Sequence, residues 1–180
     1  MVSHKGKFLI SNSTLKEKNF TEAVVFIIEH NQDGAFGLVV NQPEEKEFSS
    51  LMPELIQKTE THRIFSGGPV RPEVLFILYS SARHRYLGEE IIPDVFLGTT
   101  VDLLEILAVG NIPHHIYHGY AGWSPGQLDA EIEARTWILM PAQKEMIFHN
   151  HPEIVWREAL FFNGGIYAYF ARNIKDPFLN

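Results

Sequence analysis

The chain has 180 residues, of which 45% are hydrophobic and 12% aromatic, and its formal net charge at pH 7 is -7. This length and apolar content are enough for one core, so we expect a single domain over residues 1–180. The acidic balance, without any run of Lys or Arg, argues against direct nucleic-acid binding. The absence of cysteine excludes disulfides, thiol nucleophiles and Cys-ligated zinc.

The apolar runs of the chain indicate neither export nor a membrane span. Near the N-terminus the only such run is Phe8–Ile10, far shorter than the apolar part of a signal peptide. The longest runs, at 23–28 and 74–79, have the length of strands and are too short to cross a bilayer. We therefore expect a cytoplasmic protein with no membrane partner.

β-Branched and aromatic runs predict strands in the first half of the chain, and Gly34 lies in a turn that makes two of them a hairpin. The run Glu22–Glu29 is apolar enough to be buried on both faces. A short helix is expected with Pro53 in its first turn. The predicted elements are strands at 7–10, 22–29, 35–40 and 63–65 and a helix at 48–57.

The second half of the chain mixes strands with irregularly placed helices. Pro93 puts the predicted strand around it at an edge or a bulge, and Gly164-Gly165 ends the last helix. The predicted elements are strands at 73–80, 91–97, 114–120, 136–140 and 166–170 and helices at 101–109, 141–149 and 152–162. This order favours an α+β fold over a regular βαβ winding.

The segment from Trp123 to Gln127 is interpreted as a structural joint. Ser124 and Gln127 have the spacing of a capping box, and Pro125 suits the first helical position. An anion site at this helix start is the alternative, but the acidic residues that follow would repel a phosphate. Trp123 is expected to anchor the core.

Several other residues are candidates for a functional role. His30 at a strand end could act on a ligand or hold the following turn. Gly67 and Gly68 beside Arg71 could cradle an anion, although a tight turn is favoured. Ser66 lacks the glycine that a serine-hydrolase motif needs at position 64. The histidine sets at 114–118 and 149–151 are incomplete as metal ligands, so no metal and no cofactor are expected.

Four blocks of the sequence resemble, in order, the bacterial YqgE/AlgH family. They are GKFLISNSTLKEKNFTEAVVFIIEHNQDGAFGLVVNQP, FSGGPV, HGYAGWSPGQLDAEI and IFHNHPEIVWREAL, which together span about residues 6–165. The resemblance implies a single α+β domain with a bifurcated, mostly antiparallel sheet folded into a pseudo-barrel with flanking helices. It implies a regulator label but no established reaction or cofactor.

The family pattern falls on thirteen positions of this chain: His30, Gly34, Gly37, Asn41, Gly67, Gly68, Pro69, Gly119, Gly122, Trp123, Gly126, Gln127 and Trp156. The chain departs from the pattern at Tyr79, where members often have His, and at Ser124, where many have Gly. No catalytic residue can be carried over.

Two function classes follow from these residues. The first is a non-catalytic binding or indirectly regulatory protein that presents one surface to a protein or a small molecule. Its candidate residues are His30, Asn41, Gly67, Gly68, Pro69, Arg71, Trp123 and Gln127. The alternative is an enzyme acting on a small anionic metabolite, with His30 as acid or base and Arg71 as charge stabiliser. We favour the binding protein because no nucleophile, base and orienting group converge in the sequence.

Overall fold

The computed structural model describes residues 2–12, 18–44, 63–100, 103, 106–107, 109–165 and 167–168. Its strands are β1 (Lys7–Ser11), β2 (Val24–Asn31), β3 (Gly34–Val39), β4 (Ile64–Ser66), β5 (Val70–Tyr79), β6 (Glu89–Ile92), β7 (Val95–Gly98), β8 (His114–Trp123) and β9 (Trp137–Pro141). Its helices are the 3-10 turns η1 (Lys18–Phe20) and η4 (Ala82–Leu87) and the α-helices α2 (Gln127–Glu133), α3 (Lys144–Ile147) and α4 (Pro152–Asn163).

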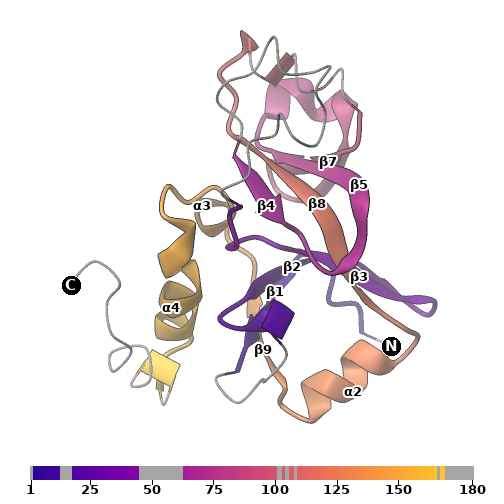
Figure 1. The fold of residues 1–180 in the computed structure, drawn as a ribbon, viewed down its shortest axis with the longest axis vertical. Helices are drawn as coiled ribbons and strands as arrows, with labels where there is room; N and C mark the ends of the chain where they lie inside the picture. Colours follow the sequence, from indigo (N-terminus) through magenta and orange to yellow (C-terminus); the bar gives the residue numbers. More distant parts are fainter. Residues whose placement is uncertain are drawn as a thin grey trace.

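Within these residues the strands form one sheet in the order β6-β7-β5-β8-β3-β2-β1-β9, with β4 added on β8. The β4–β8 pair is parallel, and the pairs along that order are antiparallel. The long strand β8 joins two parts of the sheet, because its first half lies between β4 and β5 and its end pairs with β3 (Figure 1). The sheet curls into a half-barrel, which confirms the α+β class and the bifurcated sheet.

The curled sheet separates three groups of buried side chains. The largest lies inside the half-barrel and is closed by α4, whose Trp156 donates its indole N–H to the carbonyl of Ser11. A second group lies on the other face of β1, β2, β3 and β9 and is covered by α2 through Leu128. The third covers the outer face of β5 and β7 and includes Leu103 and Leu107. Strand β2 contributes to the first two groups, as expected for a strand buried on both faces.

The structure corrects two element predictions. The apolar run 91–97 is two strands rather than one, because β6 and β7 meet in a tight turn at Pro93-Asp94, where Asp94 has φ 61. Gly164 ends α4 with φ 72 as expected, but the predicted last strand is wrong. Within 166–170 the described residues, Tyr167 and Ala168, are helical.

Two predicted helices fall partly or wholly outside the described residues. The helix expected at 48–57 lies outside them altogether. Of the helix expected at 101–109, residues Leu103, Ile106, Leu107 and Val109 are described and are helical. Among the described residues, no helix combines the length and the apolar character that a membrane crossing needs.

Candidate functional site

Two neighbouring rows of residues cross β2, β3 and β8 and face opposite sides of the sheet. One row is His30, Ala35 and Trp123, and the next is Glu29, Phe36 and Gly122. Directly paired residues share a face, whereas successive residues on a strand alternate between faces. The first row therefore faces α2, and the second faces the open end of the half-barrel.

The row under α2 is closed by hydrogen bonds around one carboxylate. Glu131 Oε2 accepts the indole N–H of Trp123 and that of Trp137, both at 2.8 Å. The two rings meet edge to face, with centroids 6.2 Å apart and an interplanar angle of 77°. Trp123 keeps only 8% of its surface exposed and packs with Leu128. These contacts fit the interpretation of Trp123 as part of a structural joint.

The start of α2 differs from the expected capping box. The helix begins at Gln127 rather than Pro125, and Gly126 precedes it with φ 74, a left-handed conformation that glycine adopts without strain. Half of the box is present, because the backbone N–H of Ser124 donates to Gln127 Oε1 at 3.0 Å. The Ser124 side chain makes no capping bond. Gln127 also donates to Glu131 at 2.9 Å, so its role here is to support the joint.

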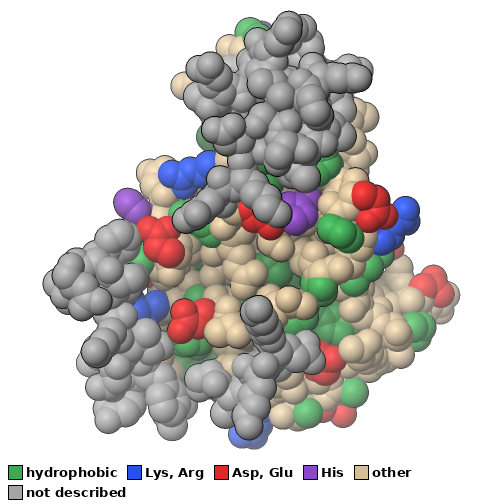
Figure 2. Space-filling model, viewed as in Figure 1, with side chains coloured by type: hydrophobic (Ala, Val, Ile, Leu, Met, Phe, Trp, Pro, Cys, Tyr) green, Lys and Arg blue, Asp and Glu red, His purple; other side chains and the backbone are tan. Residues whose placement is uncertain are grey.

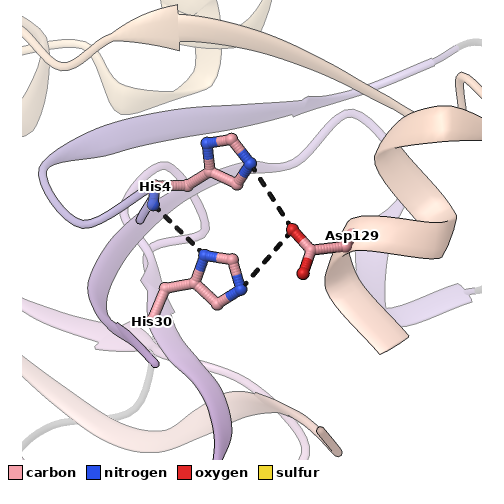
Figure 3. Close-up of side chains that lie close together, drawn as sticks. All are labelled: His4, His30 and Asp129. Atoms are coloured by element: carbon pink, nitrogen blue, oxygen red, sulfur yellow. Dashed lines mark hydrogen bonds and ion pairs between the residues drawn. The ribbon is translucent and has the colours of Figure 1, made fainter. Parts of the chain in front are cut away.

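His30 lies in a cluster with His4 and Asp129 (Figure 3). The two imidazole rings stack with centroids 5.1 Å apart, and the Nε2 atom of each lies 3.7 Å from Asp129 Oδ1. His30 Nδ1 accepts the backbone N–H of His4 at 3.1 Å, and Ser3 Oγ donates to the His30 carbonyl. The cluster ties the N-terminal segment to β2 and α2.

The hydrogen bonds of this cluster do not suit a metal centre. A metal on Nε2 needs the ring proton on Nδ1, with Nδ1 as a donor. His30 Nδ1 is instead an acceptor, and His4 Nδ1 lies 3.3 Å from the Lys7 ammonium, which can only donate. In its neutral form each ring therefore carries its proton on Nε2, the atom that lies 3.7 Å from Asp129 Oδ1. Burial, followed by the charges of Lys7 and His30, lowers the pKa of His4, while Asp129 opposes the shift.

His30 is poorly placed for acid–base work on a dissolved substrate. Only 2% of its side chain is exposed, and its two nitrogens face the His4 backbone and Asp129. Arg71, its supposed partner in the enzyme alternative, is exposed and bound to Glu73 at 3.2 Å. The pKa of Glu73 is lowered, mainly by a hydrogen bond from its own backbone N–H and then by Arg71.

The open face holds a groove of about 720 Å³, within the size range of ligand pockets, roughly 300–1,000 Å³. Its lining is Glu29, Asn31, Asp33, Gly34, Ala35, Phe36, Val70, Phe76, Tyr120, Gly122, Trp123, Ser124 and Pro125. The rings of Phe36, Phe76 and Tyr120 meet pairwise with centroids 5.9 to 6.1 Å apart. All three are half-buried, so one side packs on the core and the other reaches the groove.

Four other predicted site residues do not line the groove: Asn41, Gly67, Gly68 and Pro69. Asn41 is structural, because it bonds the backbone of Glu22 and Val24. Gly67 and Gly68 are buried against β8, where a Cβ on Gly68 would lie 2.3 Å from the backbone of Tyr120. The Gly67 N–H is already bonded to the His118 carbonyl, so these glycines form a tight crossing rather than an anion cradle. Pro69 is exposed beside them.

Consequently His30, Gly67 and Trp123 do not share one exposed surface. His30 and Trp123 face α2, whereas a side chain on Gly67 would point at Leu38 and Tyr117, which belong to the core inside the half-barrel. Trp123 reaches the groove as part of its lining, next to Gly122.

The two histidine sets singled out in the sequence do not converge. His114 Nδ1 contacts the Ile112 carbonyl, and His118 pairs with Glu44 at 2.7 Å. His115 is buried against aromatic rings, and this burial, with the nearby positive charges of Arg63 and His114, lowers its pKa to about 4. His149 accepts the backbone N–H of His151. In the described part of the chain, the only group of potential metal ligands is His4, His30 and Asp129.

Sequence reasoning missed the residues that build both faces. His4 and Asp129 are far from His30 in the sequence, and only the pairing of β1 with β2 and the docking of α2 unite them. Phe36, Phe76 and Tyr120 lie in separate apolar runs whose convergence depends on β8. The alternation along the β3 run is a sequence signal that could have indicated Phe36, because it puts Phe36 on the face opposite to Ala35.

Fold and groove together define a half-barrel protein with an aromatic-lined mouth. Residues 8–168 match the AlgH-like family, and the chain belongs to this family. It is 36% identical over 163 residues to a UPF0301 protein of Methylococcus capsulatus, covering 86% of this chain and 88% of that one. It is 37% identical over 154 residues to a UPF0301 protein of Hahella chejuensis, covering 83% of each chain.

Two solved structures are similar to this one. The solution structure of the AlgH protein from Pseudomonas aeruginosa aligns with a TM-score of 0.73 and 28% identity, covering 97% of both chains. A crystal structure of a Corynebacterium diphtheriae protein aligns with a TM-score of 0.79 over 95% of this chain and 93% of the other. At 19% identity the second match concerns the fold alone.

Proposed function

We propose that the protein is a non-catalytic binding protein whose ligand site is the groove at the mouth of the half-barrel. The observation that carries this proposal is the group of three half-buried aromatic rings, Phe36, Phe76 and Tyr120, which meet in a groove of about 720 Å³. Apolar walls with a few placed polar groups, at the mouth of a β-barrel, are typical of ligand sites.

The groove stands on a rigid support. Its floor belongs to β3, β5 and β8, and the reverse side of β3 and of the end of β8 is held by α2 through Trp123 and Glu131. A preformed site loses less conformational entropy when a ligand binds. In the enzyme alternative the acid or base would be His30, which lies buried on the other face.

We propose that regulation by this protein is indirect: it acts by binding a protein or a small molecule rather than by binding DNA. Among the described residues on the face in Figure 2, the Lys and Arg side chains are scattered and form no basic band, which a phosphate backbone would require. We propose that the protein is located in the cytoplasm, as expected from the sequence.

The test is a titration of the full chain with N-acetyl-phenylalanine amide, N-acetyl-leucine amide and N-acetyl-glycine amide, followed through backbone amide shifts by NMR. The first two compounds should move signals of groove residues such as Phe36 and Gly122, and the glycine compound should move none. Tyr120→Ala should abolish the effect. Tyr86→Ala is the matched control, because Tyr86 is 73% exposed on η4 and does not line the groove. Shifts outside the groove, or no shifts at all, would contradict the proposal.

A further inference from the structure

We propose that the occupant of the groove is a segment of a partner protein that presents an arginine or lysine beside an aromatic or aliphatic side chain. The inference rests on the proposed function, because it names the chemistry of the partner for the same groove. Its basis is the combination of an aromatic floor with a rim whose charged lining residues are all acidic.

The acidic rim consists of Glu29 and Asp33, at the end of β2 and in the turn that follows. Asn31 lies between them: its Nδ2 donates to Glu29 Oε1 at 2.6 Å, which orders that carboxylate, and its Oδ1 accepts the Asp33 backbone N–H at 2.8 Å, which orders the turn. Within the described part of the chain, neither carboxylate has a Lys or Arg partner. Two uncompensated negative charges therefore stand at the edge of an apolar groove.

The geometry places these charges next to the aromatic floor. Glu29 is the direct cross-strand partner of Phe36, and the Phe36 ring meets Tyr120 edge to face at 5.9 Å. A cation bound by Glu29 can thus lie over or beside an aromatic ring. A guanidinium suits this place because it stacks on rings and pairs with carboxylates at the same time.

Other occupants fit the groove less well. A nucleic acid or another polyanion would bring phosphates against Glu29 and Asp33. Arg71 follows the lining residue Val70 in the sequence, but its guanidinium is already paired with Glu73 and does not offset this repulsion. A neutral apolar ligand would remove water from the two carboxylates without replacing their solvation.

The experiment compares three N-acetylated, amidated dipeptides, Phe-Arg, Phe-Gln and Phe-Glu, in NMR titrations of the full chain. Because an exposed ion pair is worth up to about 1 kcal/mol, we expect Phe-Arg to bind about two- to five-fold more tightly than Phe-Gln, and Phe-Glu more weakly than both. Raising the salt concentration should shrink the difference through screening.

The double variant Glu29→Gln with Asp33→Asn should remove the preference for Phe-Arg. The matched control is Glu133→Gln with Glu145→Gln, which removes the same charge at exposed positions outside the groove and should keep the preference. Equal binding of Phe-Arg and Phe-Gln in the groove would overturn the cationic partner and leave the binding function standing. No groove shift with any dipeptide or aromatic amide would overturn both. Groove shifts with a single-stranded oligonucleotide, and none with Phe-Arg, would also overturn this inference.

Discussion

The two faces of the β2–β3–β8 strands differ although their residues alternate along the same three segments. The row His30, Ala35 and Trp123 is covered by α2, where His30 lies 3.7 Å from Asp129 and Trp123 donates to Glu131, whereas Glu29, Phe36 and Gly122 line an uncovered groove. Polar groups on the covered face have partners inside the protein. One face therefore maintains the fold, and its neighbour, one residue along each strand, is uncovered and is the proposed ligand site.

The largest effect is expected from Trp123→Ala, on the covered face. The change removes a buried indole and one donor to Glu131, and the free energy of unfolding should fall by about 3 kcal/mol or more. Urea unfolding measures this loss. Tyr120→Ala, on the open face, should lose less than half as much, because its ring is already partly in solvent. Equal losses for the two variants would contradict the different roles of the two faces.

Inside the half-barrel, stability is expected to depend on pH through His115. His115 has a pKa of about 4 in the folded protein, against 6.5 for a free imidazole, so the unfolded chain binds the extra proton first. The stability from keeping His115 neutral is present above pH 6.5 and is lost as the pH falls toward 4. The loss is about 3 kcal/mol.

Unfolding measured between pH 7 and 4 should therefore show a shallower pH dependence in His115→Phe than in the parent chain. His4, whose pKa is also lowered, adds a term of the same sign. Identical pH dependence in the two proteins would contradict the assigned burial of His115.

A smaller loss is expected from Glu131→Ala. The substitution leaves the indole N–H groups of Trp123 and Trp137 without their acceptor, which should cost about 2 kcal/mol. Glu131→Gln keeps one acceptor oxygen and should lose less. The ordering of the two variants in urea unfolding is the check, and a neutral Glu131→Ala would show that the carboxylate does not hold the joint.

The smallest losses of unfolding free energy are expected from substitutions of Ser124 and Gln127, and the two should differ. Because the Ser124 side chain makes no capping bond, Ser124→Ala should stay within about 0.5 kcal/mol of the parent. Gln127→Ala removes the acceptor for the Ser124 N–H and a bond to Glu131, and should cost more, about 1 kcal/mol. The reverse order in thermal melts would favour the full capping box over the observed helix start.

Local patterns in the sequence predicted most of the strands, and the resemblance supplied the curled sheet. The β2–β3 hairpin follows from its apolar runs around Gly34, and α4 follows from Pro152 and Gly164. The failure at 91–97 has a local cause, since Pro93-Asp94 makes a turn where an edge or bulge was expected.

The candidate site was much less predictable, because it depends on contacts between distant segments. His4 reaches His30 across 26 residues, and Asp129 arrives with α2. The three groove rings come from strands that meet only through β8. Glycine-rich blocks drew attention to Gly67 and Gly68, whose role is the close passage against β8. Sequence composition does not show which face of a strand a helix will cover.

The most direct test of the division between the two faces measures binding and stability together in Tyr120→Ala and Glu131→Gln. Affinity for the Phe-Arg dipeptide is read by NMR, and the free energy of unfolding is read by urea titration. Tyr120→Ala should lose most of the binding, whereas Glu131→Gln should lose stability and keep the binding of the folded protein. Parallel losses of binding and stability in both variants would contradict the account.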